Sequence, residues 1–122
     1  MSKTNESSED YLERILMLEQ EGNTSIHAID IANSMGFSKP SVSIALKKLE
    51  EAGYVKVNKK SVLSLTDAGR EIAKKIYDRH VVIRDFFISI GVDPKTASKD
   101  ACKIEHDLSD ETYEAFVRAI KK

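Results

Sequence analysis

The feature that most constrains the fold of this 122-residue chain is a tight turn, "GFSKP" at residues 36–40, between two short runs of helical periodicity. Pro40 suits the first turn of a helix, where a backbone N–H would have no partner within the helix. Two short helices joined by so few residues predict a helix-turn-helix. The apolar stripes of the two runs are Ile26, Ile29, Ile31, Ala32 and Met35 before the turn, and Val42, Ala45, Leu46 and Leu49 after it.

The segments that flank this motif predict a winged form of it. Before it, residues 8–21 have apolar positions at helical spacing behind Ser7 or Ser8 as a cap, and Ser25 is expected to cap the second helix. After it, residues 54–66 alternate apolar and polar on both sides of "NKKS", as the two strands of a hairpin do. We therefore expect a wing directly after the third helix.

The second half of the chain is predicted to be helical, and each helix starts at residues whose side chains are typical caps. The fold class is therefore mainly α with a small β-hairpin. We expect an N-terminal winged helix-turn-helix domain over residues 1–66 and a helical domain over residues 67–122. The predicted bounds are Thr66 or Asp67 to Gly91 for a long fourth helix, Asp93–Pro94 to about Leu108 for a fifth, and Ser109 onward for a sixth.

The composition excludes several classes of protein. No apolar run reaches the roughly 18 residues of a membrane span, and the start of the chain lacks the apolar stretch of a secretory signal. The only cysteine, Cys102, cannot form an internal disulfide. We expect a soluble, cytoplasmic protein in a reducing compartment, with no membrane partner.

The charge of the chain is unevenly distributed although its formal net value is only −1. Residues 38–60 carry six lysines and two glutamates, whereas residues 1–21 carry six acids and two basic residues. The first of these segments suits a polyanion and the second suits cations.

In a winged helix-turn-helix the third helix enters the major groove of double-stranded DNA, so the lysine-rich segment indicates DNA binding. We predict that the start of this helix faces base edges and that lysines on it and on the wing tip contact phosphate. The alternatives are a solvated lysine-rich surface and a winged helix that binds protein. The predicted DNA-binding residues are Ser38, Lys39, Pro40, Ser41 and Ser43 at the helix start, and Lys47, Lys48, Lys59 and Lys60 for phosphate.

A second group of residues indicates metal binding. In "DACKIEH", residues 100–106, Cys102, Glu105 and His106 stand at i, i+3 and i+4. A helix would present their sulfur, oxygen and nitrogen donors on one face. The alternative is that Cys102 is a small buried hydrophobe and that the other two belong to a solvated surface.

Three further residues are candidates for the same site. Asp10 and Glu13 share a face of the first helix, although most such pairs are plain surface acids. His80 lies in the middle of the long helix, one residue before an apolar run, where it must reach water or find a partner. If these helices pack together, the acids and His80 would converge with the "DACKIEH" residues.

Over nearly its whole length the sequence resembles the metal-dependent repressors of the diphtheria toxin repressor and manganese transport regulator family. The resemblance implies a transcriptional repressor, not an enzyme, that binds a palindromic operator as a homodimer when a divalent metal is bound. It implies that residues 67–122 bind metal and dimerise, that genes of metal homeostasis are controlled, and that there is no small organic substrate. The matching segments are "SEDYLERILMLEQEG", "SKPSVSIALKKLEEAGYV", "LTDAGREIAKKIYDRH" and "DACKIEHDLSDE". The metal ligands that it implies are Asp10, Glu13, His80, Cys102, Glu105 and His106.

The implied ligand set is a hybrid of the two branches of the family. Iron-responsive members have Met where Asp10 stands, and manganese-responsive members have Glu where Cys102 stands. The second metal site of the iron branch is not expected in that form, because Arg84 and Ser98 replace its carboxylate and its His. Larger members add an SH3-like domain, so a chain that ends at Lys122 is expected to be a minimal two-part regulator or a shortened one.

The donor types rank the candidate metals. Thiolate favours softer, later metals and carboxylate suits Mn²⁺, so Fe²⁺ is the first candidate, Mn²⁺ the second, and Zn²⁺ or Co²⁺ are expected to bind in vitro. Two other functions stay open. One is a winged-helix DNA-binding regulator without a metal requirement. The other, a small zinc hydrolase with Glu105 as base, is disfavoured because "IEH" lacks the H-E-x-x-H spacing.

Overall fold

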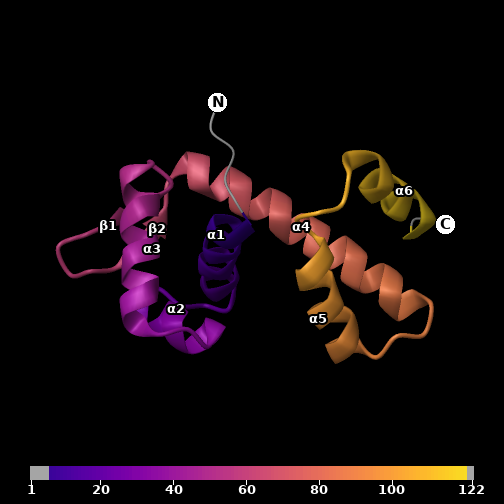
Figure 1. Cartoon of the computed structure of the whole chain (residues 1–122), viewed down its shortest axis with the longest axis horizontal. Helices are drawn as coiled ribbons and strands as arrows, with labels where there is room; N and C mark the ends of the chain where they lie inside the picture. The colour runs from indigo at the N-terminus through magenta and orange to yellow at the C-terminus, as the bar shows by residue number, and fades with distance from the viewer. Residues whose placement is uncertain (1–5, 121–122) are drawn as a thin grey trace. The chain divides into compact units, whose positions relative to one another are not determined.

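The computed structural model describes residues 6–120, which form six helices and one antiparallel hairpin (Figure 1). The mainly α fold class with a small hairpin is therefore confirmed. The chain divides into two compact units, Met1–Lys74 and Lys75–Lys122, and the division falls inside the long fourth helix. No helix in the described part of the chain is long and apolar enough to cross a membrane. The elements are α1 (Glu6–Gln20), α2 (Ala28–Met35), α3 (Lys39–Glu51), β1 (Val55–Val57), β2 (Leu63–Leu65), α4 (Asp67–Ser89), α5 (Pro94–Ile104) and α6 (Asp110–Ile120).

The first unit is built around α1, which contacts α2, α3 and β2, while α3 also packs beside β1 (Figure 1). Each helix contributes one apolar stripe to a shared core, and the hairpin adds the inward side chains of its two strands. Burying these side chains is the main stabilising term of the unit. Its fully or almost fully buried members include Leu12, Ile15, Ile31, Val42, Leu46, Val55 and Leu65.

Two predicted helix caps in this unit are wrong. Ser7 and Ser8 lie inside α1, which begins at Glu6. Ser25 does not cap α2, which begins after His27, whose backbone N–H donates to Asp30 Oδ2 at 2.8 Å. The reason is that Ile26 pairs with the wing instead: its carbonyl accepts from the Leu63 N–H at 2.7 Å in an isolated β-bridge.

The turn, the third helix and the wing form as predicted. The Ser41 N–H donates to Ser38 Oγ at 3.4 Å, which caps α3, and Pro40 lies in the first turn. In the wing β1 pairs with β2 so that Val55 faces Leu65. Its tip is held by Asn58, whose side chain accepts from two backbone N–H groups at 2.8 and 3.0 Å.

The start of α4 is fastened to the end of α3 and the start of the wing. Thr66 Oγ1 accepts from the Gly69 N–H at 3.1 Å, as predicted for a cap, and its hydroxyl donates to Gly53 O at 2.6 Å. A Cβ atom at Gly69 would overlap the backbone carbonyl of Tyr54. This glycine therefore allows α4 to lie directly against the chain that enters β1.

The second unit consists of most of α4 together with α5 and α6. Asp93 caps α5, and Ser109 Oγ accepts from the Thr112 N–H at 3.1 Å at the start of α6, both as predicted. The rings of Phe86 and Phe116 stack at 4.7 Å and join α4 to α6. The prediction that α5 continues to about Leu108 is wrong, because α5 ends at Ile104. Beyond it the Asp107 and Leu108 N–H groups donate to Ile104 O in a turn, and the Glu105 and Leu108 carbonyls accept from Arg79 of α4.

Candidate functional site

Three of the predicted ligands come together in the second unit. One donor atom each from His80, Cys102 and Glu105 lies within 4.8 Å of the other two. His80 Nδ1 is 3.5 Å from Glu105 Oε1 and 3.6 Å from Cys102 Sγ. The long helix α4 supplies the imidazole, α5 supplies the thiol, and the residue that ends α5 supplies the carboxylate. A nitrogen, a sulfur and an oxygen donor therefore lie close enough together to bind one metal ion.

The burial of this group fits a bound cation. His80 is 2% exposed and Glu105 is fully buried. Within the described residues, neither carboxylate oxygen of Glu105 accepts a hydrogen bond. A buried carboxylate without hydrogen bonds is costly unless a positive charge compensates it. A divalent metal ion supplies such a charge, and exposed Cys102 marks the side from which solvent reaches the group.

The second nitrogen of His80 is also engaged. Nε2 lies 3.2 Å from Ser98 Oγ, one turn before Cys102 on α5. In metal sites the nitrogen that does not bind the ion usually bonds to such an outer partner, which fixes the ring orientation. From the sequence, Ser98 was noted only as the residue that replaces a His of the iron branch's second site. Its spacing of four from Cys102 is the signal that places both on one helix face.

The predicted helical face holds for Cys102 and Glu105, whereas His106 lies beyond the end of α5. Glu105 caps the C-terminal end of α5, and His106 follows in a turn, half-buried. Cys102 and Glu105 both face His80, because Glu105 keeps helical backbone angles and donates its N–H to Ala101 O at 3.0 Å, one turn along the same side. Among the described residues, the three-residue group does not include His106.

Asp10 and Glu13 lie one turn apart on α1, in the first unit. Glu13 is only 4% exposed, which contradicts its interpretation as a plain surface acid. Asp10 is half-buried beside Tyr11. Burial raises the pKa of the Tyr11 phenol, and the negative charge of Asp10 raises it further. The acidic face of α1 thus borders the core of its unit.

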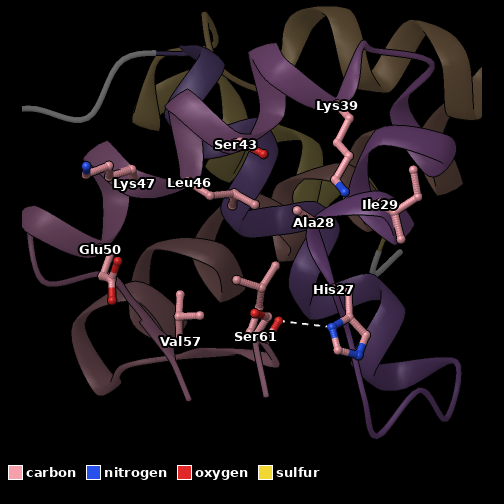
Figure 2. A pocket seen from close by; sticks show the side chains of 11 residues that line it. His27, Ala28, Ile29, Lys39, Ser43, Leu46, Lys47, Glu50, Val57 and Ser61 are labelled. Atoms are coloured by element: carbon pink, nitrogen blue, oxygen red, sulfur yellow. Dashed lines mark hydrogen bonds between the residues drawn. The ribbon is translucent and has the colours of Figure 1, made fainter. Parts of the chain in front are cut away.

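The nine predicted DNA-binding residues are all exposed on the first unit. Lys39, Ser43 and Lys47 stand at intervals of four on α3 and line one side of a groove of about 570 Å³. His27, just before α2, and Ser61 of the wing are also among the residues that line it (Figure 2). The buried stripe of α3 holds the helix in place while its opposite face stays open.

A hydrogen bond between two lining residues joins the start of α2 to the wing. His27 Nδ1 lies 3.0 Å from Ser61 O, as the dashed line in Figure 2 shows. Because a carbonyl only accepts, Nδ1 is the nitrogen that donates. Ser61 has a φ of 62°, in the left-handed region, at the wing tip that carries Lys59 and Lys60. This role of His27 was not predicted, since His27 and Ser61 are far apart in the chain.

Ile44 is a further surface residue that sequence analysis missed. It is 61% exposed on α3, although it is a large apolar side chain. Ser41 and Lys48 precede and follow it by about one turn, so it shares their side of the helix. The sequence signal is that Ile44 is apolar but lies outside the buried apolar stripe of α3 that contains Val42 and Leu46.

Comparisons with known proteins agree with this combination of wing and metal centre. Residues 3–63 match the family model of the iron dependent repressor N-terminal DNA binding domain. Residues 66–122 match that of the iron dependent repressor metal binding and dimerisation domain. The chain is 43% identical over 110 residues to an HTH-type transcriptional regulator of Methanocaldococcus jannaschii, covering 89% of this chain and 88% of the relative.

Two other relatives extend this likeness. The transcriptional regulator MntR of Bacillus subtilis is 36% identical over 107 residues, which cover 87% of this chain and 74% of the relative. MntR of Salmonella typhimurium is 34% identical over 89 residues, which cover 73% and 57%. The solved structure of the manganese regulator SloR superposes with a TM-score of 0.81 at 28% identity, over 99% of this chain and 55% of that one.

The fold and the site define a metal-dependent regulator with a winged helix-turn-helix. The chain belongs to the family of iron-dependent repressors, which are transcriptional regulators and not enzymes. The resemblance inferred from the sequence is confirmed. The chain spans about half the length of the SloR structure and 57% of Salmonella MntR.

Proposed function

We propose that this protein represses transcription by binding operator DNA as a homodimer when a divalent transition metal is bound. The observation that carries the proposal is the fully buried Glu105 carboxylate, which lies beside His80 and Cys102 without a hydrogen bond to either oxygen. A buried carboxylate of this kind is strongly stabilised when a cation binds beside it. A regulator of this family is expected to act in the cytoplasm, where its DNA lies.

We propose that Asp10, Glu13 and His106 complete the ligand set. The support is the sequence match to both branches of the family and the burial of Glu13 on α1. Ligands in two units make metal affinity depend on how the units are arranged, and a ligand shifts such an equilibrium only by its differential affinity. When bound, the ion supplies positive charge that neutralises the acidic donors. About a 100-fold difference in metal affinity is enough for a useful switch.

Fe²⁺ is the proposed effector, with Mn²⁺ next. The thiolate of Cys102 favours the softer and later of these two ions. The manganese regulator SloR supports the second candidate. Zn²⁺ and Co²⁺ are proposed to bind in vitro, because nitrogen and sulfur donors hold both.

The surface of α3 and the wing is proposed to contact DNA. The exposed start of α3, from Ser38 to Ser43, faces bases, and Ile44 offers an apolar contact to a thymine methyl group. Lys47 and Lys48 of α3 then reach phosphate. Lys59 and Lys60 do so from the wing tip. A homodimer presents two such surfaces and suits a palindromic operator.

The proposal is tested with metal-free protein and DNA selected by it from a random-sequence pool in the presence of Fe²⁺. Binding is then titrated metal by metal. We expect specific binding to appear with Fe²⁺ or Mn²⁺ and to disappear with a chelator. Specific binding that survives the chelator would instead establish the alternative, a winged-helix regulator without a metal requirement.

Single variants test the ligand assignment. Cys102→Ala and Asp10→Ala should each lose metal-stimulated binding but keep weak, salt-sensitive binding to any DNA. Cys102→Glu should keep activation and move the preference toward Mn²⁺, because an oxygen donor replaces sulfur. If both alanine variants respond to Fe²⁺ and Mn²⁺ as the unmodified protein does, the ligand set is wrong.

A further inference from the structure

The residue next to His80 on α4 is a buried arginine with three polar partners. Arg79 is 6% exposed, and its Nη1 donates to Glu105 O at 3.2 Å and to Leu108 O at 2.6 Å. Its Nη2 donates to a carboxylate oxygen of Asp110. A planar guanidinium presents several N–H donors in fixed directions, so one side chain bonds to three residues at once.

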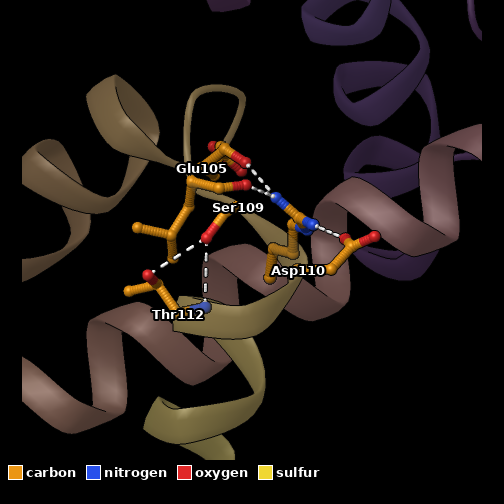
Figure 3. A network of polar contacts seen from close by, with 6 residues as sticks. Glu105, Ser109, Asp110 and Thr112 are labelled. Atoms are coloured by element: carbon orange, nitrogen blue, oxygen red, sulfur yellow. Dashed lines mark hydrogen bonds and ion pairs between the residues drawn. The ribbon is translucent and has the colours of Figure 1, made fainter.

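These partners mark the end of α5 and the start of α6. The last carbonyls of a helix have no partner within it, and here Arg79 satisfies two carbonyls just beyond α5. Asp110 is the first residue of α6, and the guanidinium also lies 5.1 Å from the ring centre of Tyr113 in that helix. Figure 3 shows the bonds to Glu105 and Asp110, together with the neighbouring pair of bonds between Ser109 and Thr112.

The contact with Glu105 bears on the metal centre. Within the described part of the chain, the two carboxylate oxygens of Glu105 accept no hydrogen bond that could orient the group. Its position is therefore set by its rotamer and by where its backbone is held. Arg79 bonds to the backbone carbonyl of this same residue, while its neighbour His80 supplies the facing nitrogen. Two adjacent residues of α4 therefore contact Glu105: Arg79 at its backbone carbonyl and His80 at its carboxylate.

We infer that Arg79 is a positioning residue of the metal centre, which holds Glu105 in place for the cation and ties that placement to the start of α6. This inference rests on the proposed binding of metal by His80, Cys102 and Glu105. It assigns a role in metal binding to a residue that offers no ligand atom. A purely structural role would affect folding of the metal-free protein but leave the affinity for metal unchanged.

The test uses Arg79→Lys in the full chain, which keeps the charge and removes the planar fork. The matched control is Arg70→Lys, because Arg70 makes a two-pronged pair with Glu19, at 2.8 and 3.3 Å, in the first unit. Co²⁺ is the probe. Charge-transfer absorption from the Cys102 thiolate to Co²⁺ reports binding, and thermal unfolding of the metal-free variants reports stability.

We expect Arg79→Lys to bind Co²⁺ roughly 10- to 100-fold more weakly, as is typical when an outer partner of a ligand is lost. Arg70→Lys should bind as the unmodified protein does. Equal Co²⁺ affinity in Arg79→Lys, whatever its unfolding temperature, would overturn the inference.

A second variant keeps the test decisive if Arg79→Lys does not fold. Asp110→Ala removes the ion pair between Arg79 and Asp110. The Asp110 side chain is 79% exposed, so the variant is expected to fold. It should lower Co²⁺ affinity several-fold, and an unchanged affinity would overturn the inference. Absence of the charge-transfer band in the unmodified protein is a different result, since it would overturn the metal centre itself and this inference with it.

Discussion

His80 shows how single atoms define the site. Its Nδ1 faces Glu105 and Cys102, whereas its Nε2 faces Ser98 Oγ at 3.2 Å. If Nε2–H donates to the serine, the lone pair of Nδ1 points at the place where the two other donors meet. The serine hydroxyl can accept from Nε2–H, so the contact is compatible with the tautomer that binds metal through Nδ1 and it orients the ring.

The first prediction concerns this hydroxyl. Ser98→Ala should weaken binding of Co²⁺ or Mn²⁺ by about 10-fold, because the imidazole loses the partner that orients it. Metal affinity is measured by competition with a chelator of known affinity. Thr96→Ala, an exposed residue on the first turn of α5, is the control and should leave affinity unchanged. Equal affinities in the two variants would remove Ser98 from the site.

At the scale of elements, the junction of α4 with the wing depends on close approach. Gly69 lies within α4, so alanine at this position would ordinarily stabilise the helix by up to about 1 kcal/mol. Here the added Cβ meets the backbone carbonyl of Tyr54, which a side-chain rotation does not relieve. The tertiary contact therefore predicts that Gly69→Ala destabilises the protein, whereas helix propensity predicts that it stabilises it.

The second prediction follows from that opposition. Gly69→Ala should lower the free energy of unfolding by about 3 kcal/mol, since inserting an atom into a packed backbone contact forces the chain to move. Chemical denaturation followed by circular dichroism gives this value. A variant as stable as the unmodified protein, or more stable, would show that α4 does not approach the wing entry so closely.

The third prediction concerns α3 and the wing as charged elements. Replacing Lys47, Lys48, Lys59 or Lys60 with Ala should weaken binding to all DNA sequences similarly. Each lost phosphate contact should flatten the log–log salt dependence by ~1 unit. Lys103→Ala, an exposed lysine of α5, is the control. Unchanged slopes in all four variants would contradict the assignment.

At the scale of the whole molecule, the second unit exposes apolar side chains that its own helices do not cover. Ile88 and Ile90 at the end of α4 and Ile120 at the end of α6 are exposed. Contiguous exposed apolar surface is typical of protein interfaces. The family model that matches this half describes a metal binding and dimerisation domain.

The fourth prediction is that the protein is a dimer at micromolar concentration, with or without metal. Burying these isoleucines against a second copy stabilises the dimer through the hydrophobic effect, which does not require the ion. Light scattering on metal-free and metal-loaded protein measures the mass. A monomer in both samples would contradict the prediction.

Much of the fold was predictable because its signals are local. The stripe of Val42 and Leu46, the cap at Thr66 and the cap at Asp93 each depend on residues within a few positions of one another. The hydrogen bonds of these two caps join a side chain to the next turn of its own helix, so they need no distant partner. The donor types of Cys102 and Glu105 were equally visible in the sequence.

The rest was decided by tertiary contacts, which compete with those local signals. Ser25 loses its cap role because Ile26 pairs with Leu63 of the wing, a residue remote in the sequence. The predicted last turn of α5 is a non-helical turn, and Arg79 of α4, remote in the sequence, bonds to the Glu105 and Leu108 carbonyls there. The sequence by itself determined the helices, the wing and the kinds of ligand atom. Only the tertiary structure decided which atoms meet, since burying a carboxylate such as Glu105 beside His80 depends on segments that no local rule brings together.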